Sequence, residues 1–187
     1  MKRGRPRAGL GIAGLACLGA ALALCLPCAS GQQRDERAVR AAYVFNLTKY
    51  VQWPQEKSEL IIAFSGSPTT GEKLRELLEG KASESRSIHV VLVPPEEDLP
   101  MCAILYLTDP PSKKLRASLD KPENRGILTV GETDSFVREG GMVGLVKVRD
   151  QIQIQVNLEA TQQAGVKISS RLLNLAVLVR SDSSARN

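Results

Sequence analysis

The chain is poor in the residues that usually build active sites. Its 187 residues include one histidine, His89, and four cysteines, and aromatic residues make up 4% of the sequence. A zinc site requires several His or Cys ligands at recurrent spacing, and a Ser or Cys nucleophile normally requires a histidine beside it. No Gly-x-Ser-x-Gly elbow occurs either. We therefore expect a protein without catalytic activity, metal or cofactor.

Acidic residues are absent before Asp35, whereas four of the 25 basic residues lie in the first seven positions. An uncharged stretch rich in Ala, Gly and Leu follows over 8–26, and small residues occupy 29–31. This order is typical of a secretory signal peptide. We expect residues 1–31 to be a cleaved leader, and 32–187 to be a single domain in the periplasm. An uncleaved anchor helix and lipid attachment at Cys25 or Cys28 are the alternatives.

Loss of the leader changes both the charge and the cysteine count. The remaining 21 Lys and Arg nearly balance the 20 Asp and Glu, so the mature chain lacks the positive charge that a nucleic-acid partner requires. Cys102 becomes the only cysteine, which excludes an internal disulfide. It opens the apolar run 102–107, so we expect a buried thiol. A reactive thiol paired with His89 is the alternative.

Apolar strands and amphipathic helices alternate along the mature chain. This pattern predicts an α/β fold, a three-layer sandwich in which helices cover both faces of a mostly parallel sheet. The predicted helices lie near 37–53, 73–78 and 112–119, and the predicted strands over 60–64, 88–93, 102–107 and 127–130. In the first helix the apolar face is expected to comprise Val39, Ala42, Tyr43, Asn46, Leu47, Tyr50 and Val51.

The C-terminal part departs from this alternation. Runs 142–148 and 151–156 predict an antiparallel hairpin at the sheet edge, with three glutamines of the second run facing solvent. Asn157 is expected to cap a short helix that Gly165 closes. A last helix carrying Leu172, Leu173, Leu175, Ala176 and Leu178 is apolar nearly all round, so we expect it to be buried or bound to a partner.

Three local patterns could bind a ligand. Gly66 and Gly71 have the spacing of a phosphate-binding loop, but Glu72 stands where the lysine belongs. The acidic run 96–98 is more typical of a solvated loop than of an acid/base pair. The residues Lys167, Ser169 and Arg171 could contact a partner or a small anion, or they could form an ordinary helix start.

Several segments together resemble the YfiR family of exported bacterial proteins. The stretch Ala41-Ala-Tyr-Val-Phe-Asn-Leu-Thr-Lys-Tyr-Val-Gln-Trp-Pro54 resembles the opening signature of that family, and Ala164-Gly-Val-Lys-Ile-Ser-Ser-Arg-Leu-Leu173 resembles the closing one. Segments 102–107, 127–131, 136–142 and 156–158 recur between them, and the similarity covers about residues 38 to 179. Asn46, Trp53, Asn157 and Gly165 are the expected structural residues of this pattern.

The resemblance implies a periplasmic regulator that binds the sensor region of an inner-membrane diguanylate cyclase and inhibits it. Cyclic di-GMP and biofilm formation would then be kept low. It also implies a homodimer, and an outer-membrane lipoprotein that can remove the regulator. Family members with disulfides pair a cysteine matching Cys102 with one near the first strand, where this chain has none. A periplasmic small-molecule receptor acting on another membrane sensor is the alternative.

Overall fold

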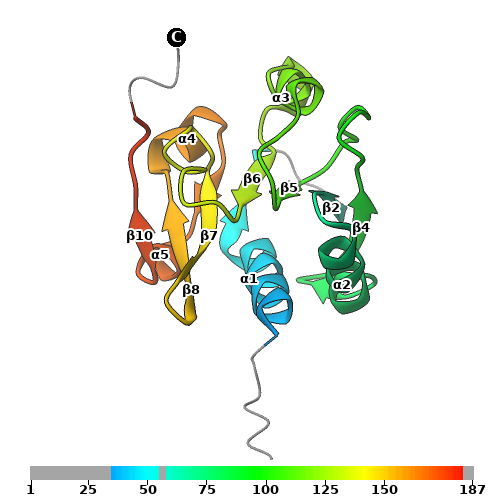
Figure 1. Ribbon diagram of the computed structural model, residues 1–187, viewed down its shortest axis with the longest axis horizontal. Helices are drawn as coiled ribbons and strands as arrows, with labels where there is room; N and C mark the ends of the chain where they lie inside the picture. Colours follow the sequence, from blue (N-terminus) through cyan, green and yellow to red (C-terminus); the bar gives the residue numbers. More distant parts are fainter. Residues whose placement is uncertain (1–34, 55–57, 183–187) are drawn as a thin grey trace, which may run out of the picture. The chain divides into compact units, whose positions relative to one another are not determined.

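The computed structural model describes residues 35–54 and 58–182. The expected leader, 1–31, lies outside them. The elements in chain order are α1 (Glu36–Tyr50), β1 (Val51–Gln52), β2 (Glu59–Ser65), α2 (Pro68–Leu78), β3 (Ala82–Ser83), β4 (Arg86–Leu92), β5 (Ile104–Leu107), α3 (Lys113–Leu119), η1 (Pro122–Asn124), β6 (Leu128–Gly131), β7 (Val143–Val148), β8 (Gln151–Val156), α4 (Leu158–Gln163), β9 (Lys167–Ile168), α5 (Ser170–Leu173) and β10 (Ala176–Leu178) (Figure 1).

Eight of these strands form one sheet in the order β10-β8-β7-β6-β5-β2-β4-β3. Neighbouring strands from β4 to β7 run parallel, whereas β7 with β8 and β3 with β4 run antiparallel. β1 and β9 form a separate antiparallel ribbon, in which Val51 lies opposite Ile168. The predicted α/β class, the mostly parallel sheet and the antiparallel hairpin are confirmed.

Helices cover both faces of the sheet because alternate strand residues point to opposite sides. On one face, Ile62 of β2 and Ile104 of β5 pack in the larger core with α1 and α2. On the other face, Ala63 and Leu105 pack in a smaller core with Leu115 of α3. The central strands are therefore buried on both sides, as a parallel sheet requires.

The predicted apolar face of α1 is only partly right: Leu47 and Val51 are buried as predicted, but its other members are half-buried or exposed. The buried residues are Arg40, Ala41, Val44, Leu47 and Thr48, whereas Asn46 is only half-buried. The helix also ends at Tyr50, because the next two residues join the ribbon with β9. The prediction failed because Arg40 is buried, whereas hydrophobicity alone assigns a charged residue to the solvent side.

The predicted last helix is wrong as well. α5 has only four residues, and the chain then forms β10, which pairs in parallel with β8. The hairpin is therefore not the sheet edge, and Gln155, expected to face solvent, is buried. This short apolar segment forms a strand because the backbone of β8 has unpaired hydrogen-bonding groups along its outer edge. The sequence could not predict this, because a short run of apolar residues shows no hydrophobic periodicity that distinguishes a strand from a helix.

Candidate functional site

A cluster of charged and polar side chains lies under α1, at the ends of β5 and β6. Arg40 Nε of α1 lies 3.1 Å from Glu132 Oε2, directly after β6. The Arg40 Nε–H is not directed at the carboxylate, so this contact is an ion pair but not a hydrogen bond. Tyr106 Oη of β5 donates to Glu132 Oε1 at 2.5 Å. The side chains of Arg40 and Glu132 are only 11% and 19% exposed, so both charges are largely withdrawn from water.

The electrostatics of this cluster are dominated by burial. Burial raises the pKa of Glu132, while the hydrogen bond from Tyr106 and the charge of Arg40 act against that rise. Burial, followed by the charge of Glu132, raises the pKa of Tyr106 far above its usual range. A buried ion pair with one satisfying hydroxyl fixes the position of a helix. We interpret this arrangement as an anchor for α1.

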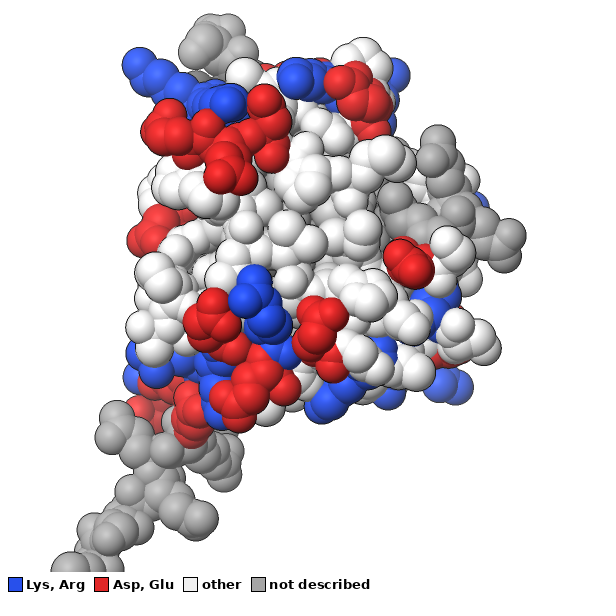
Figure 2. Space-filling view, turned by 90° about the vertical axis from the view of Figure 1, so that its right-hand side faces the viewer, with Lys and Arg blue, Asp and Glu red and all other residues white. Residues whose placement is uncertain are grey.

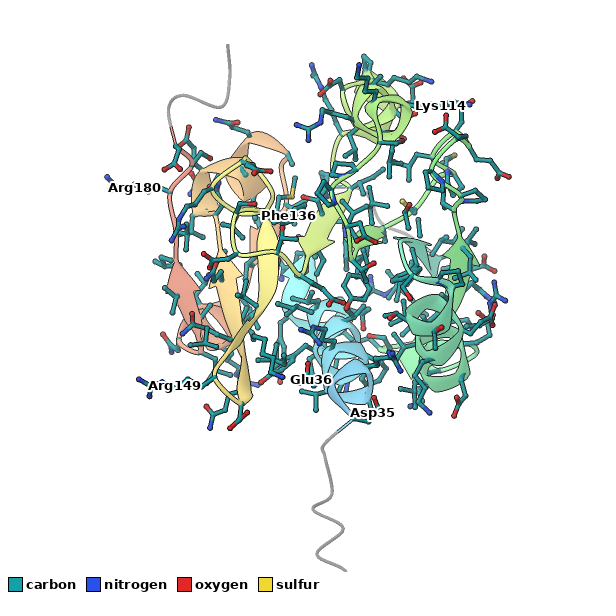
Figure 3. The ribbon with its side chains drawn as sticks, viewed as in Figure 1. Asp35, Glu36, Lys114, Phe136, Arg149 and Arg180 are labelled. Atoms are coloured by element: carbon teal, nitrogen blue, oxygen red, sulfur yellow. The ribbon has the colours of Figure 1, made fainter. Side chains whose placement is uncertain are left out.

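The anchor extends along α1 to the hairpin of β7 and β8. Glu36 Oε2 accepts from Arg40 Nη1 at 3.3 Å, and Glu36 Oε1 pairs with Lys147 of β7. The bond with Lys147 is the largest cause that lowers the pKa of Glu36. Figure 3 shows Glu36 at the start of α1, near the hairpin end that carries Arg149. The N-terminal part of α1 is thus tied to two parts of the sheet, through Glu36 to β7 and through Arg40 to the residue after β6.

The two residues of the thiol hypothesis are not brought together. Cys102 is 3% exposed and packs in the smaller core before β5. His89 lies on β4, which β2 separates from β5, and its Nδ1 lies 2.9 Å from Glu79 Oε1. A thiol–imidazole pair needs hydrogen-bond contact. The structure therefore gives the pair of Cys102 and His89 no support.

The acidic run 96–98 contacts a lysine of α3. Lys114 Nζ donates to the carbonyl oxygen of Glu96 at 2.8 Å and lies 3.5 Å from Asp98 Oδ2. Figure 2 shows charges of both signs side by side at two ends of the β4 side, with a broad uncharged band between them. This face therefore carries no extended region of one charge.

No group of three His, Cys, Asp or Glu in 35–54 and 58–182 could hold a metal ion.

The predicted contact residues Lys167, Ser169 and Arg171 lie in and after β9. Lys167 is exposed and lies opposite Gln52 in the ribbon. The Ser169 backbone N–H donates to Tyr50 O at 2.9 Å, while its Oγ is buried without a hydrogen-bond partner among the described residues. Arg171 is exposed on α5. Their role in binding stays a prediction.

Two of the expected structural residues, Trp53 and Asn157, join distant segments of the chain. Trp53 Nε1 donates to Ala103 O at 3.0 Å, which joins the chain after β1 to the start of β5. Asn157 caps α4 as predicted, because its Oδ1 accepts from Ala160 N, and its Nδ2 donates to Val137 O. Gly165 has φ +72° just after α4, where glycine is favoured.

A second feature is an apolar edge, which includes Leu175 and Leu178, the residues expected on a last helix that is buried or bound to a partner. Of the six exposed large hydrophobic side chains in the described residues, four lie on β10, directly before it, or on the β7–β8 hairpin: Val148, Leu175, Val177 and Leu178. Leu175 is 76% exposed. It lines a groove along β8 together with Tyr43 and Ile152. We name Leu175, Val177 and Leu178 the β10 edge. An exposed apolar strand edge of this kind is typical of a surface that associates with another protein.

Comparison with known proteins identifies the family. The family model described as YfiR/HmsC-like matches residues 37–177, so the chain belongs to the YfiR/HmsC-like family. No curated protein matches the chain. The family assigns the chain to the periplasmic regulators of cyclic di-GMP signalling. No helix among the described residues has the length and apolarity to cross a membrane.

Proposed function

We propose that this member of the YfiR/HmsC-like family binds the periplasmic sensor region of an inner-membrane diguanylate cyclase and holds it inactive. Cyclic di-GMP synthesis, and with it biofilm formation, is thereby kept low. The protein performs no chemical step of its own. Repression of this kind requires the regulator to bind the inactive state of its partner more tightly than the active state.

The observation that carries this proposal is the β10 edge. Its three apolar side chains are 44% to 76% exposed, although a soluble monomer rarely groups large hydrophobic residues on a free strand edge. The anchor of α1 complements it, because Arg40, Glu36 and Lys147 tie α1 to the sheet beside the same hairpin. A rigid surface loses little entropy on binding. In this proposal the homodimer and the capture by an outer-membrane lipoprotein are further associations of the regulator.

The test compares two variants in the native bacterium. In a strain that lacks the gene, complementation with the wild-type chain is expected to lower cyclic di-GMP. The double variant Leu175→Asp/Leu178→Asp should fail to do so, because two carboxylates would have to be desolvated at the contact. Met101→Asp is the matched control, since Met101 is an 82% exposed hydrophobic residue outside the β10 edge. Immunoblots verify equal amounts of all three proteins.

Crosslinking identifies the partner directly. A photoreactive amino acid at position 177 of a tagged copy should capture a membrane diguanylate cyclase, and the same probe at position 101 should not. A gene deletion without any rise in cyclic di-GMP would refute the proposal. Capture of a different sensor, together with thermal stabilisation by a small molecule that loses its effect in Lys167→Gln/Arg171→Gln, would favour the small-molecule receptor instead.

A further inference from the structure

The aromatic residues of this chain are concentrated at one place. The sequence has seven of them, and four lie between Tyr43 and Trp53. Phe45, Tyr50 and Trp53 follow the second half of α1 into β1, and each is half-buried against the larger core. Each ring therefore keeps part of its surface exposed at this end of α1.

Cations lie over two of these rings. Lys49 Nζ lies 4.4 Å from the centre of the Phe45 ring, and Lys81 Nζ lies 5.8 Å from the centre of the same ring. Arg86 Cζ lies 5.7 Å from the centre of the Trp53 ring. These distances are within the range of cation–π contacts. Three cations and two aromatic rings thus form one surface, which we name the cation–aromatic surface.

Hydrogen bonds hold the parts of this surface in place. Thr48 Oγ1 of α1 donates to Ser83 Oγ of β3 at 2.8 Å, and both residues are buried. Arg86 Nη2 donates to Thr48 O at 3.3 Å. These bonds fix α1 relative to β3 and hold the Arg86 guanidinium beside α1 before any partner binds.

The surface has an excess of positive charge. Arg86 pairs with Glu84, whose side chain is 69% exposed. In the part of the chain that the structure describes, neither Lys49 nor Lys81 forms an ion pair. Two lysines over one ring repel each other, and an anion placed between them would relieve that repulsion. Lys167 adds a further exposed cation on the adjoining β1–β9 ribbon.

We propose that the cation–aromatic surface binds the anionic phospholipid headgroups of a bilayer and so keeps the regulator at the membrane surface. Lysine and arginine attract anionic headgroups, and tryptophan favours the boundary between headgroups and hydrocarbon. An acidic protein surface would satisfy the cations alone. The partly exposed rings beside them favour the lipid, because it offers both phosphate and an apolar boundary. This inference does not depend on which membrane protein is regulated.

The test uses protein isolated from the periplasmic fraction and two kinds of vesicle. One contains phosphatidylglycerol and phosphatidylcholine, and the other contains phosphatidylcholine only. Trp53 is the only tryptophan of the chain, so its fluorescence reports on this surface directly. We expect co-sedimentation with the anionic vesicles only, a blue shift of the Trp53 emission, and weakening of both by salt.

Variants in which lysines are replaced by uncharged glutamine show which cations bind the vesicles. Lys49→Gln/Lys81→Gln should weaken binding to the anionic vesicles about 25-fold, because each lysine near an anionic surface contributes about fivefold. The control Lys73→Gln/Lys114→Gln removes two lysines that form ion pairs on α2 and α3, and it should bind like the wild type.

Three results would overturn the inference: equal binding to both vesicle types, equal loss in both double variants, or a Trp53 shift caused by a soluble acidic protein but not by vesicles. Repression of cyclic di-GMP synthesis by the β10 edge can persist in all three cases. The failure of this inference is therefore distinguishable from failure of the proposed function.

Discussion

Replacement of Arg40 by methionine tests whether the buried ion pair anchors α1. The variant keeps the length of the aliphatic stem but leaves the carboxylate of Glu132 without its cation. Removal of one partner of a buried pair commonly costs about 3–5 kcal/mol. Because the side chain of Glu132 is still 19% exposed, we expect the lower end, about 3 kcal/mol. With a urea m-value of about 2 kcal/mol per M, the unfolding midpoint should fall by about 1.5 M.

The assay is urea unfolding followed by Trp53 fluorescence, with Arg138→Met as the control. Arg138 pairs with Asp134 at 3.5 Å on the surface, where both side chains are more than half exposed. Removal of that arginine should cost less than about 1 kcal/mol. The double variant Arg40→Met/Glu132→Gln should be more stable than Arg40→Met, because the remaining buried group is neutral and still accepts from Tyr106.

The pH dependence of the same variant follows from the raised pKa of Glu132. In the folded chain this pKa is raised above its usual value of 4.5. The ionised carboxylate is therefore less stable in the folded chain than in the unfolded chain. The contribution of Glu132 is therefore most favourable below about pH 4.5 and is lost as the pH rises through the folded-state pKa. Loss of Arg40 removes a cause that lowers this pKa. The cost of Arg40→Met should consequently be larger at neutral pH than at pH 4.5, because it is lost as the pH falls through the folded-state pKa of Glu132, which lies above 4.5 in the wild type and is higher still in the variant. A cost as small as that of Arg138→Met, or one independent of pH, would refute the reasoning.

Three further predictions concern other contacts. Asn157→Ala removes the cap of α4 and one of the two donors to the Val137 carbonyl, which also accepts from Gly140 N, so thermal or urea unfolding should reveal a loss of about 2 kcal/mol, whereas Gln163→Ala on the exposed end of α4 should have little effect. Gly66→Ala should destabilise by about 2 kcal/mol, because Gly66 has φ +148° and a Cβ would lie 1.8 Å from Thr108 Oγ1; Gly66→Ala/Thr108→Ala should recover part of the loss, and failure to do so would assign the cost to the backbone alone. The pKa of Glu36 is lowered, chiefly by Lys147, so its stabilising effect is present above pH 4.5 and is lost as the pH falls through the lowered pKa. The stability difference between the wild type and Glu36→Gln should therefore shrink on acidification, and a difference that stays constant with pH would contradict the role of the pair.

The sequence by itself determined the features that depend on local patterns. Strands and helices alternate because apolar residues recur with periods of two and of three to four. The hairpin of β7 and β8, the Asn157 cap and the turn at Gly165 follow from residues within a few positions of one another. The paired signatures at both ends of the domain also sufficed to indicate the family, which the match over 37–177 confirms.

Only the tertiary structure decided which face of α1 is buried, where the charged anchor lies, and that the chain after α5 forms a strand. Arg40 and Glu132 are far apart in the sequence, and a local pattern assigns each of them to solvent. They can be buried only because the sheet brings β6 under α1, where each charge compensates the other. The β10 edge has the same origin, because the apolar residues 176–178 became a strand only beside the open edge of β8. Contacts between distant segments thus produced both the anchor and the exposed surface to which we assign the function.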